Sequence, residues 1–311
     1  MDFHKKQMEE AAILYYEKKY TQNEIAQLMK LSRQTVSKLL NDAIKENIVE
    51  IKIHDPQVVC NELATEICTR FQIKNVVICG VSTDNESLRQ LMTVKKAADH
   101  ILSLVQEGNQ KIALSWGRTI QMLASEMQQT STSDNIVFPL FGATDQEQSY
   151  FLSNELARSF ADKIGASVKY AWFPYRPDSI DDCELFKKTS YYKKLYDLWN
   201  DIDIAIIGIG NSAIIQTFAK IFGYNERGIS AIGDISTHFF DINGAFIELY
   251  ENTLCASKEN LKNAKQTIAV ASGNDKTEAI IGALRTQLID TLITDEYTAR
   301  NILTLLKRGM K

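Results

Sequence analysis

The chain has 311 residues, 45% of them hydrophobic and 24% charged, proportions typical of a globular protein long enough for two domains. Its formal net charge of −4 argues against general affinity for polyanions, so any nucleic-acid contact must be confined to a local basic patch. The five cysteines include no CxxC pair and the four histidines are scattered, so we expect no disulfide framework, no metal and no cofactor.

Two absences bear on where the protein works. The first residues, MDFHKKQMEE, contain no apolar run typical of a signal peptide. No later segment stays apolar long enough to cross a bilayer, because Gly, Asn and Asp interrupt even IDIAIIGIGNSAII. We therefore expect a cytoplasmic protein with no membrane partner.

Residues 21–40, TQNEIAQLMKLSRQTVSKLL, have the pattern of two short helices joined by a tight turn, and residues 5–18 precede them as a scaffold helix. Thr21 and Glu24 form a capping box for the first helix, whose expected buried residues are Ile25, Ala26 and Leu28. Ser32 caps the second helix, in which the apolar residues at helical spacing are Val36, Leu39, Leu40 and Ala43. Lys30 stands in the turn where many such motifs have Gly. The pattern predicts a helix-turn-helix.

The second of these helices is predicted to read DNA. Residues 30–45 contain four basic residues and one acidic residue, whereas residues 1–57 are neutral with nine of each sign. An α-helix fits the major groove, where its polar side chains reach base edges and phosphates. The expected DNA contacts are Gln22, Ser32, Arg33, Gln34, Thr35, Ser37 and Lys38. The alternative is a packed helical hairpin whose charged face is only solvated.

A change of period marks the end of this module. In IVEIKIH, residues 48–53 alternate between two faces, which predicts a strand and hence a winged helix-turn-helix. Asp55-Pro56 then starts a helix with Pro at its first position. Its apolar stripe, which could pack on its own domain or on a second copy, is Val59, Leu63, Ile67 and Phe71. We place a DNA-binding domain at residues 1–56 and an effector and oligomerisation domain at 57–311, with 57–71 as the connecting helix.

The second domain is predicted to be α/β, with a mostly parallel sheet covered by helices. Four strand-like runs end at a glycine turn: KIALSWGRT, NIVFPLFGATDQ, DIDIAIIGIGN and TIAVASGNDK. Ligands bind beyond the carboxyl ends of such strands, where glycine lets backbone amides and a helix amino terminus approach an anion. The candidate ligand residues at these turns and nearby are Ser115, Gly117, Arg118, Thr119, Gly142, Thr144, Gly210, Asn211, Asp234 and Lys276.

Each of these turn residues also has a plain alternative as tight-turn chemistry or a solvated charge. GIG is not GxGxxG, so a dinucleotide site is not expected, and no GxSxG or nucleophile–base pair indicates catalysis. The basic, aromatic segment ELFKKTSYYKKLYDLW fits an amphipathic helix better than a nucleic-acid site. Its expected apolar stripe is Leu185, Tyr192, Leu195 and Trp199.

With these residues assembled, the chain resembles the SorC family of sugar-binding transcriptional regulators over nearly its whole length. The resemblance rests on the helix-turn-helix segment, SWGRT, FPLFG, GIGN, GDIS with FFDING, SGNDKTEAIIGALR and LITDEYTARNIL, in that order. It implies a winged helix-turn-helix followed by a Rossmann-like effector domain similar to the glucosamine-6-phosphate deaminase and ribose-5-phosphate isomerase fold. It also implies phosphorylated sugars as effectors, and homodimers or homotetramers on palindromic double-stranded operator DNA.

Carried onto this sequence, the family's phosphate loop matches Gly117, Arg118 and Thr119. The ligand-facing turns match Gly142, Gly210, Asp234 and Lys276. Many relatives have a Gly-rich or basic loop where this chain has Phe141, which offers neither charge nor amine; the expected effector is therefore a monophosphorylated hexitol, ketose or pentose.

The expected function is regulation of a carbohydrate-utilisation operon. One competing hypothesis is a sugar-phosphate isomerase or deaminase with an accessory helix-turn-helix. Another is a constitutive DNA-binding protein with an empty α/β scaffold.

Overall fold

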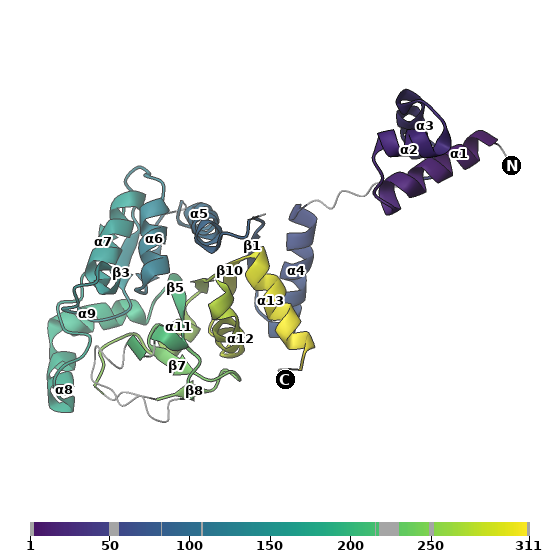
Figure 1. Ribbon diagram of the computed structural model, residues 1–311. Coiled ribbons are helices and arrows are strands. Elements are labelled where there is room, and N and C mark those ends of the chain that lie inside the picture. The colour runs from purple at the N-terminus through teal and green to yellow at the C-terminus, as the bar shows by residue number, and fades with distance from the viewer. Residues whose placement is uncertain are drawn as a thin grey trace. The chain divides into compact units, whose positions relative to one another are not determined.

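The computed structural model describes residues 3–49, 56–81, 83–106, 108–214, 216–217, 230–248 and 252–309. The chain divides into two compact units, Met1–Asp55 and Pro56–Lys311 (Figure 1), which are considered one at a time. Most of the predicted wing strand falls on residues 50–53, which lie outside the described residues, so the wing stays a prediction. No helix in the described parts of the chain is long and apolar enough to cross a membrane.

The amino-terminal unit is helical. Its core side chains are Met8, Ala11, Ala12, Ile25, Val36, Leu39, Leu40 and Ala43. Its elements are α1 (Phe3–Ala12), a π-helical turn η1 (Ile13–Glu17), α2 (Gln22–Met29) and α3 (Arg33–Lys45). Both predicted caps are confirmed: Glu24 N donates to Thr21 Oγ1 at 3.3 Å while Thr21 N donates to Glu24 Oε2 at 2.8 Å, and Thr35 N donates to Ser32 Oγ at 3.0 Å. Thr21 N and Thr21 Oγ1 both donate to Glu24 Oε2 at 2.8 Å, and these hydrogen bonds lower the pKa of Glu24.

Two residues near the end of α2 depart from the pattern expected for a helix-turn-helix, Lys30 in the turn and Leu28 on the helix. Lys30 adopts φ 55°, the left-handed conformation that favours glycine at a helix end. The expectation that Leu28 is buried is wrong, since its side chain is 59% exposed. α2 is only eight residues long, so Ile25 and the half-buried Ala26 and Met29 already fill the contact with the core.

The second unit is built on a sheet whose main path is parallel, as predicted. The strand order is β1-β10-β9-β5-β2-β3-β4, and the far end of β5 continues into an antiparallel β6-β7-β8 extension. The strands are β1 (Asn75–Cys79), β2 (Lys111–Leu114), β3 (Ile136–Pro139), β4 (Ser167–Val168), β5 (Ile204–Asn211), β6 (Gly233–Ile235), β7 (His238–Phe240), β8 (Phe246–Ile247), β9 (Gln266–Val270) and β10 (Thr291–Asp295). The central strands contain apolar, buried runs at residues 204–207 of β5 and 268–270 of β9, as sheets covered on both faces require.

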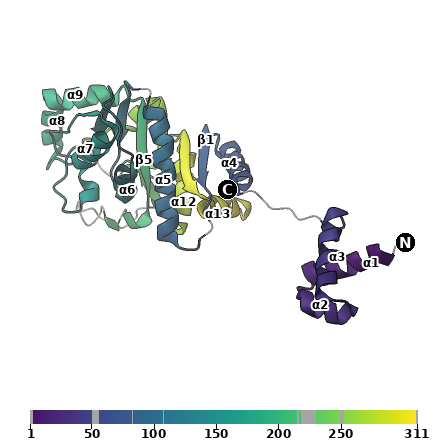
Figure 2. The ribbon, with the colours of Figure 1, turned by 90° about the horizontal axis from the view of Figure 1, so that it is seen from above.

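Helices flank both faces of the sheet (Figures 1 and 2). On one face, α5 packs against α6 and α6 against α7; on the other, α12 packs against α13 and α13 against α4. The helices are α4 (Pro56–Phe71), α5 (Glu86–Val105), α6 (Arg118–Glu126), η2 (Ser149–Phe151), α7 (Ser153–Ile164), α8 (Ile180–Lys188), α9 (Ser190–Trp199), α11 (Lys258–Asn263), η3 (Asn274–Lys276), α12 (Thr277–Arg285) and α13 (Glu296–Lys307).

The order of the strands creates a crevice in the middle of the sheet. From β2 the chain moves outward through β3 to β4, then returns to β5 on the other side of β2 and continues outward through β9 to β10. Successive crossovers therefore leave β2 and β5 in opposite directions. Helices connected in opposite directions cover opposite faces, so the carboxyl ends of β2 and β5 are left open between them.

Two helical predictions are refined by the packing. In α4, Ile67 and Phe71 are buried in the core of this unit, so the stripe packs on its own domain. The basic, aromatic segment is not one helix, because Thr189 ends α8 and caps α9. The expected stripe therefore breaks: Leu195 and Trp199 are buried, whereas Leu185 on α8 is 63% exposed.

Candidate functional site

A cavity of about 500 Å³ lies at the carboxyl ends of β2, β5 and β9. This is the place where the chain order reverses, which is where open α/β sheets bind ligands. The amino-terminal turn of α5, which follows β1, and the turn between β6 and β7 contribute further wall residues. Its volume suits a small molecule such as a sugar.

One wall is the turn from β2 into α6. Gly117 adopts φ 116° and precedes α6, and no side chain caps that helix amino terminus within the described residues. Gly117 N donates to Tyr150 O at 2.8 Å, while the Arg118 guanidinium lies 5.2 Å from the Tyr150 ring centre. Ser115 ties this turn to β5, because its Oγ accepts a 3.1 Å hydrogen bond from Gly208 N. Helix amides and a guanidinium on one wall favour an anion.

The opposite wall comes from the antiparallel pair β5 and β6, in which Gly210 faces Asp234. A Cβ on Gly210 would lie 2.0 Å from Asp234 Oδ1, so any other residue would displace the Asp234 side chain. Asp234 is buried and its Oδ2 accepts from Thr237 N at 3.0 Å. Burial raises the pKa of Asp234 to about 6, although the Thr237 hydrogen bond and the nearby Lys276 charge oppose the shift.

The hairpin turn that follows Asp234 is unusual. Ser236 and Thr237 have φ values of 49° and 64°, in the left-handed region where L-residues cost about 1–2 kcal/mol each. Thr237 is also β-branched, which makes such a conformation rarer still. Ser236 lines the cavity and is 4% exposed, and its Oγ makes no hydrogen bond within the described part of the chain. The turn thus places a buried, unpaired hydroxyl on the cavity wall.

The turn after β9 completes the pocket. Asn211 Nδ2 donates to Asp275 Oδ2 at 2.7 Å, which joins this turn to the end of β5. Lys276 is half-buried, and burial lowers its pKa while the carboxylates of Asp275 and Asp234 oppose the shift. The ammonium therefore lies among carboxylates rather than in open solvent. Such a group can donate to a ligand oxygen.

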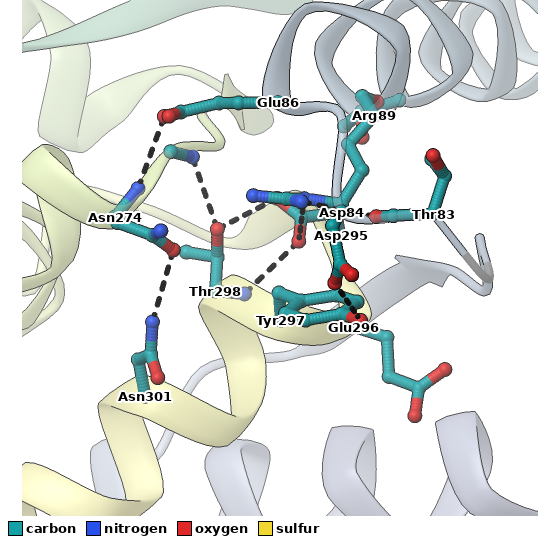
Figure 3. A network of polar contacts seen from close by, with 12 residues as sticks. Thr83, Asp84, Glu86, Arg89, Asn274, Asp295, Glu296, Tyr297, Thr298 and Asn301 are labelled. Carbon is teal, nitrogen blue, oxygen red and sulfur yellow. Dashed lines mark hydrogen bonds and ion pairs between the residues drawn. The ribbon is translucent and has the colours of Figure 1, made fainter.

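A polar network fixes this turn to the neighbouring helices (Figure 3). Asn274 N donates to Glu86 Oε1 of α5 at 3.3 Å, and Asn274 Oδ1 accepts from Asn301 Nδ2 of α13 at 3.1 Å. Deeper in the network, Arg89 Nε lies 3.7 Å from Asp295 Oδ1, both side chains being buried. The rim of the cavity is thereby connected to α13, which packs on α4.

Eight of the ten predicted ligand residues line this cavity: Ser115, Gly117, Arg118, Thr119, Gly210, Asn211, Asp234 and Lys276. Gly142 and Thr144 lie elsewhere. A Cβ on Gly142 would lie 2.4 Å from Pro174 O, so that glycine serves a close backbone approach. Thr144 Oγ1 donates to Phe151 O at 2.9 Å and lines a separate open hollow. The neighbouring Phe141 is fully buried and stacks on Trp116, which turns this loop into core.

Sequence reasoning missed several wall residues. They are Glu86, Ser87, Gln90, Tyr150, Ser236, Ser272 and Asp275. Ser272 and Asp275 stand in the same SGND turn as Lys276, so the motif itself was a signal for them. The α5 residues Glu86, Ser87 and Gln90 had no such signal in the sequence, because they come from a helix start without a glycine turn.

In the amino-terminal unit, six of the seven predicted DNA-contacting residues lie on α3 or at its cap, and Gln22 begins α2. Four of them are exposed on the helix: Arg33, Gln34, Thr35 and Lys38. Ser37 and Gln22 are half-buried, and the exposed Ser32 is engaged in the cap. Ser32 Oγ also shares a hydrogen bond with Thr35 Oγ1 at 2.7 Å, so both hydroxyls help fix the start of α3. An exposed polar face at the beginning of a second helix is the arrangement that reads a major groove.

Comparison with known proteins gives two family matches. Residues 55–304 match the family described as "Putative sugar-binding domain", and residues 10–46 match "Sigma-70, region 4". The sorbitol operon regulator of Klebsiella pneumoniae is 28% identical, covering 94% of this chain and 96% of that protein. The deoxyribonucleoside regulator of Bacillus subtilis is 26% identical, covering 96% and 98%. The crystal structure of the full-length Klebsiella regulator covers 97% of this chain and 99% of its own, with a TM-score of 0.74 and 27% identity.

Proposed function

The chain belongs to the SorC/DeoR family of transcriptional regulators, with a helix-turn-helix and a sugar-binding domain, and from this premise we propose its ligand and mode of control. Its α3 reads an operator, and a phosphorylated sugar or polyol in the 500 Å³ cavity changes the affinity for that operator. Residues 1–56 are assigned to DNA binding and 57–311 to effector binding and self-association. The observation that carries the proposal is the pairing of an anion-favouring wall with a hydroxyl-binding wall in one sugar-sized cavity.

The phosphate is assigned to the amino terminus of α6. Uncapped amides there carry partial positive charge, and Arg118 can give two parallel hydrogen bonds to a phosphate. Thr119, at the same helix start, adds a hydroxyl donor. The exposed rim position of Arg118 lets it fold onto a ligand after entry.

The remainder of the ligand is assigned to the far wall. Asp234, Asn211 and Lys276 present two acceptors and several donors, which matches a chain of hydroxyl groups. Glu86 and Asp275 make that end unfavourable for a second phosphate, so the ligand carries one. Two relatives are named for sorbitol and deoxyribonucleoside regulation, which favours a monophosphorylated polyol or pentose here.

Operator control requires more than one copy. Two copies would place two α3 helices on a palindromic site, and a ligand that favours one arrangement of the copies shifts affinity by the difference between them. We also propose that the effector domain is similar in fold to sugar-phosphate isomerases and deaminases. Relatives are regulators rather than enzymes, so the cavity is assigned to sensing.

The test of the effector site is isothermal titration of the full chain with a panel of sugar and polyol monophosphates. Arg118→Ala should weaken the tightest binder about ten- to a hundredfold, because a charge-assisted hydrogen bond contributes about 1.5–3 kcal/mol. Arg158→Ala, which removes an exposed arginine on α7, is the matched control and should bind like wild type. No binding by any monophosphate, or equal binding by both variants, would reject this assignment.

The test of the DNA-binding surface is titration of a labelled fragment of the protein's own promoter region. Arg33→Ala should lose about 1–3 kcal/mol of specific affinity if Arg33 reads a base edge. Arg300→Ala, an exposed arginine on α13 paired with Glu296, is the matched control. Equal affinity of the wild type for promoter and random DNA would contradict the regulator assignment.

A further inference from the structure

We propose that Ser236 is the residue that reads one particular hydroxyl group of the effector, and that it sets the specificity of the cavity for that hydroxyl over a deoxy analogue. The inference rests on the proposed sugar-phosphate effector and deepens it. It assigns to one side chain a discrimination that the phosphate wall cannot make.

The first support is the state of the Ser236 hydroxyl. The residue is 4% exposed and lines the cavity, while its Oγ is buried and has no hydrogen-bond partner within the described residues. Buried polar groups in folded proteins are nearly always paired, so one left without a partner calls for an explanation. Rotation of the Ser236 side chain about χ1 toward the cavity lets a ligand hydroxyl supply the missing partner.

The second support is the backbone of the turn. Ser236 and Thr237 both adopt left-handed φ angles, although neither is Gly, Asn or Asp. A two-residue hairpin of this kind normally uses those residues because they adopt the conformation without strain. Strain of this sort persists where the surrounding structure needs the side chain in that place. Here it places Ser236 on the cavity wall and directs Thr237 N to Asp234 Oδ2.

The third support is the neighbouring carboxyl. Asp234 Oδ2 is held by Thr237 N, while Oδ1 lies on the side where a Cβ on Gly210 would stand. A serine hydroxyl can donate or accept, and the carboxylate accepts. Together they can satisfy both the proton and a lone pair of a single ligand hydroxyl. A site built in this way rejects the analogue that lacks the hydroxyl, because both protein groups are then left unpaired.

The experiment is a cycle of variants and ligands on the full chain, measured by isothermal titration. The probes are glucose 6-phosphate, fructose 6-phosphate, sorbitol 6-phosphate and ribose 5-phosphate, followed by the monodeoxy analogues of whichever binds most tightly. Wild type should lose about tenfold or more in affinity for the analogue lacking the hydroxyl that Ser236 reads. Ser236→Ala should discriminate between that analogue and its parent about fivefold less than wild type does, because only Asp234 still contacts the hydroxyl, and should keep wild-type discrimination at the other carbons.

Two further variants separate the hydroxyl from the backbone. Ser236→Gly also lacks the hydroxyl but adopts the left-handed conformation freely, so it should lose the same single discrimination as Ser236→Ala. Ser103→Ala removes an exposed serine of α5 that is not among the cavity-lining residues, and it should discriminate as wild type does. Wild-type discrimination in both Ser236 variants, or an equal loss at every carbon, would overturn the inference while leaving the effector assignment intact. Binding of no probe by wild type would overturn both.

Discussion

The raised pKa of Asp234 predicts how the free energy of unfolding depends on pH, and one substitution can isolate this dependence. Burial raises this pKa from 3.8 to about 6, so the folded protein holds the proton more tightly than the unfolded chain. Between about pH 4 and pH 6 the unfolded carboxyl has lost its proton while the folded one keeps it. The folded state then binds more protons, so this group lowers the free energy of unfolding as pH rises. At 1.36 kcal/mol per unit, the full cost above pH 6 is about 3 kcal/mol.

Asp234→Asn cannot titrate and keeps the shape of the side chain. The difference in unfolding free energy, variant minus wild type, should therefore grow by about 2 kcal/mol between pH 4 and pH 7, since the unfolded carboxyl is already partly ionised at pH 4. Urea denaturation followed by tryptophan fluorescence measures this, because Trp116, Trp172 and Trp199 all lie in the second unit. Asp201→Asn is a control of opposite sign: its hydrogen bond and ion pair with Lys111 lower the pKa, so its stabilising contribution is lost as pH falls. Parallel curves for Asp234→Asn and wild type would refute the reasoning.

Three other changes test the packing around the two functional regions. Thr21→Ala removes the capping box and should destabilise α2 by about 1 kcal/mol, seen as roughly fivefold faster amide exchange over Gln22–Met29; unchanged exchange would contradict it. Lys30→Gly relieves the left-handed strain at the end of α2 and should slow that exchange by up to about fivefold; faster exchange would count against it. Arg89→Met leaves the buried Asp295 without its cation and should cost about 3–5 kcal/mol in urea denaturation; a loss below about 1 kcal/mol would exclude a structural pair.

Features set by neighbouring residues were predictable from the sequence. The capping box at Thr21, the Ser32 cap, the apolar spacing of α3 and the helix starting at Pro56 depend on residues close together in the sequence, and each is present. The glycine turns after β2, β5 and β9 were also readable, because parallel strands bring their carboxyl ends to one edge. That local logic placed eight of ten candidate residues around one cavity.

Features set by distant packing were not predictable. The turn after β3 has the same glycine signature, yet Gly142 is there because the Pro174 backbone passes within contact distance. The sequence near Leu185 does not indicate that Thr189 caps a new helix and that Leu185 is left exposed. Ser236 lacks a local signal as well, because its role depends on a hairpin folding back over β5. Such positions are decided by which segments meet in space.

The central claim is that the cavity and the recognition helix act on each other. Its most direct test is fluorescence anisotropy of a labelled promoter fragment titrated with the full chain, with and without the tightest-binding monophosphate at a saturating concentration. We expect a shift in operator affinity of about five- to 150-fold, the usual range of coupling between two sites, and no shift in Arg118→Ala at a concentration that saturates only wild type. An operator affinity that is identical with and without a ligand bound by the cavity would contradict it.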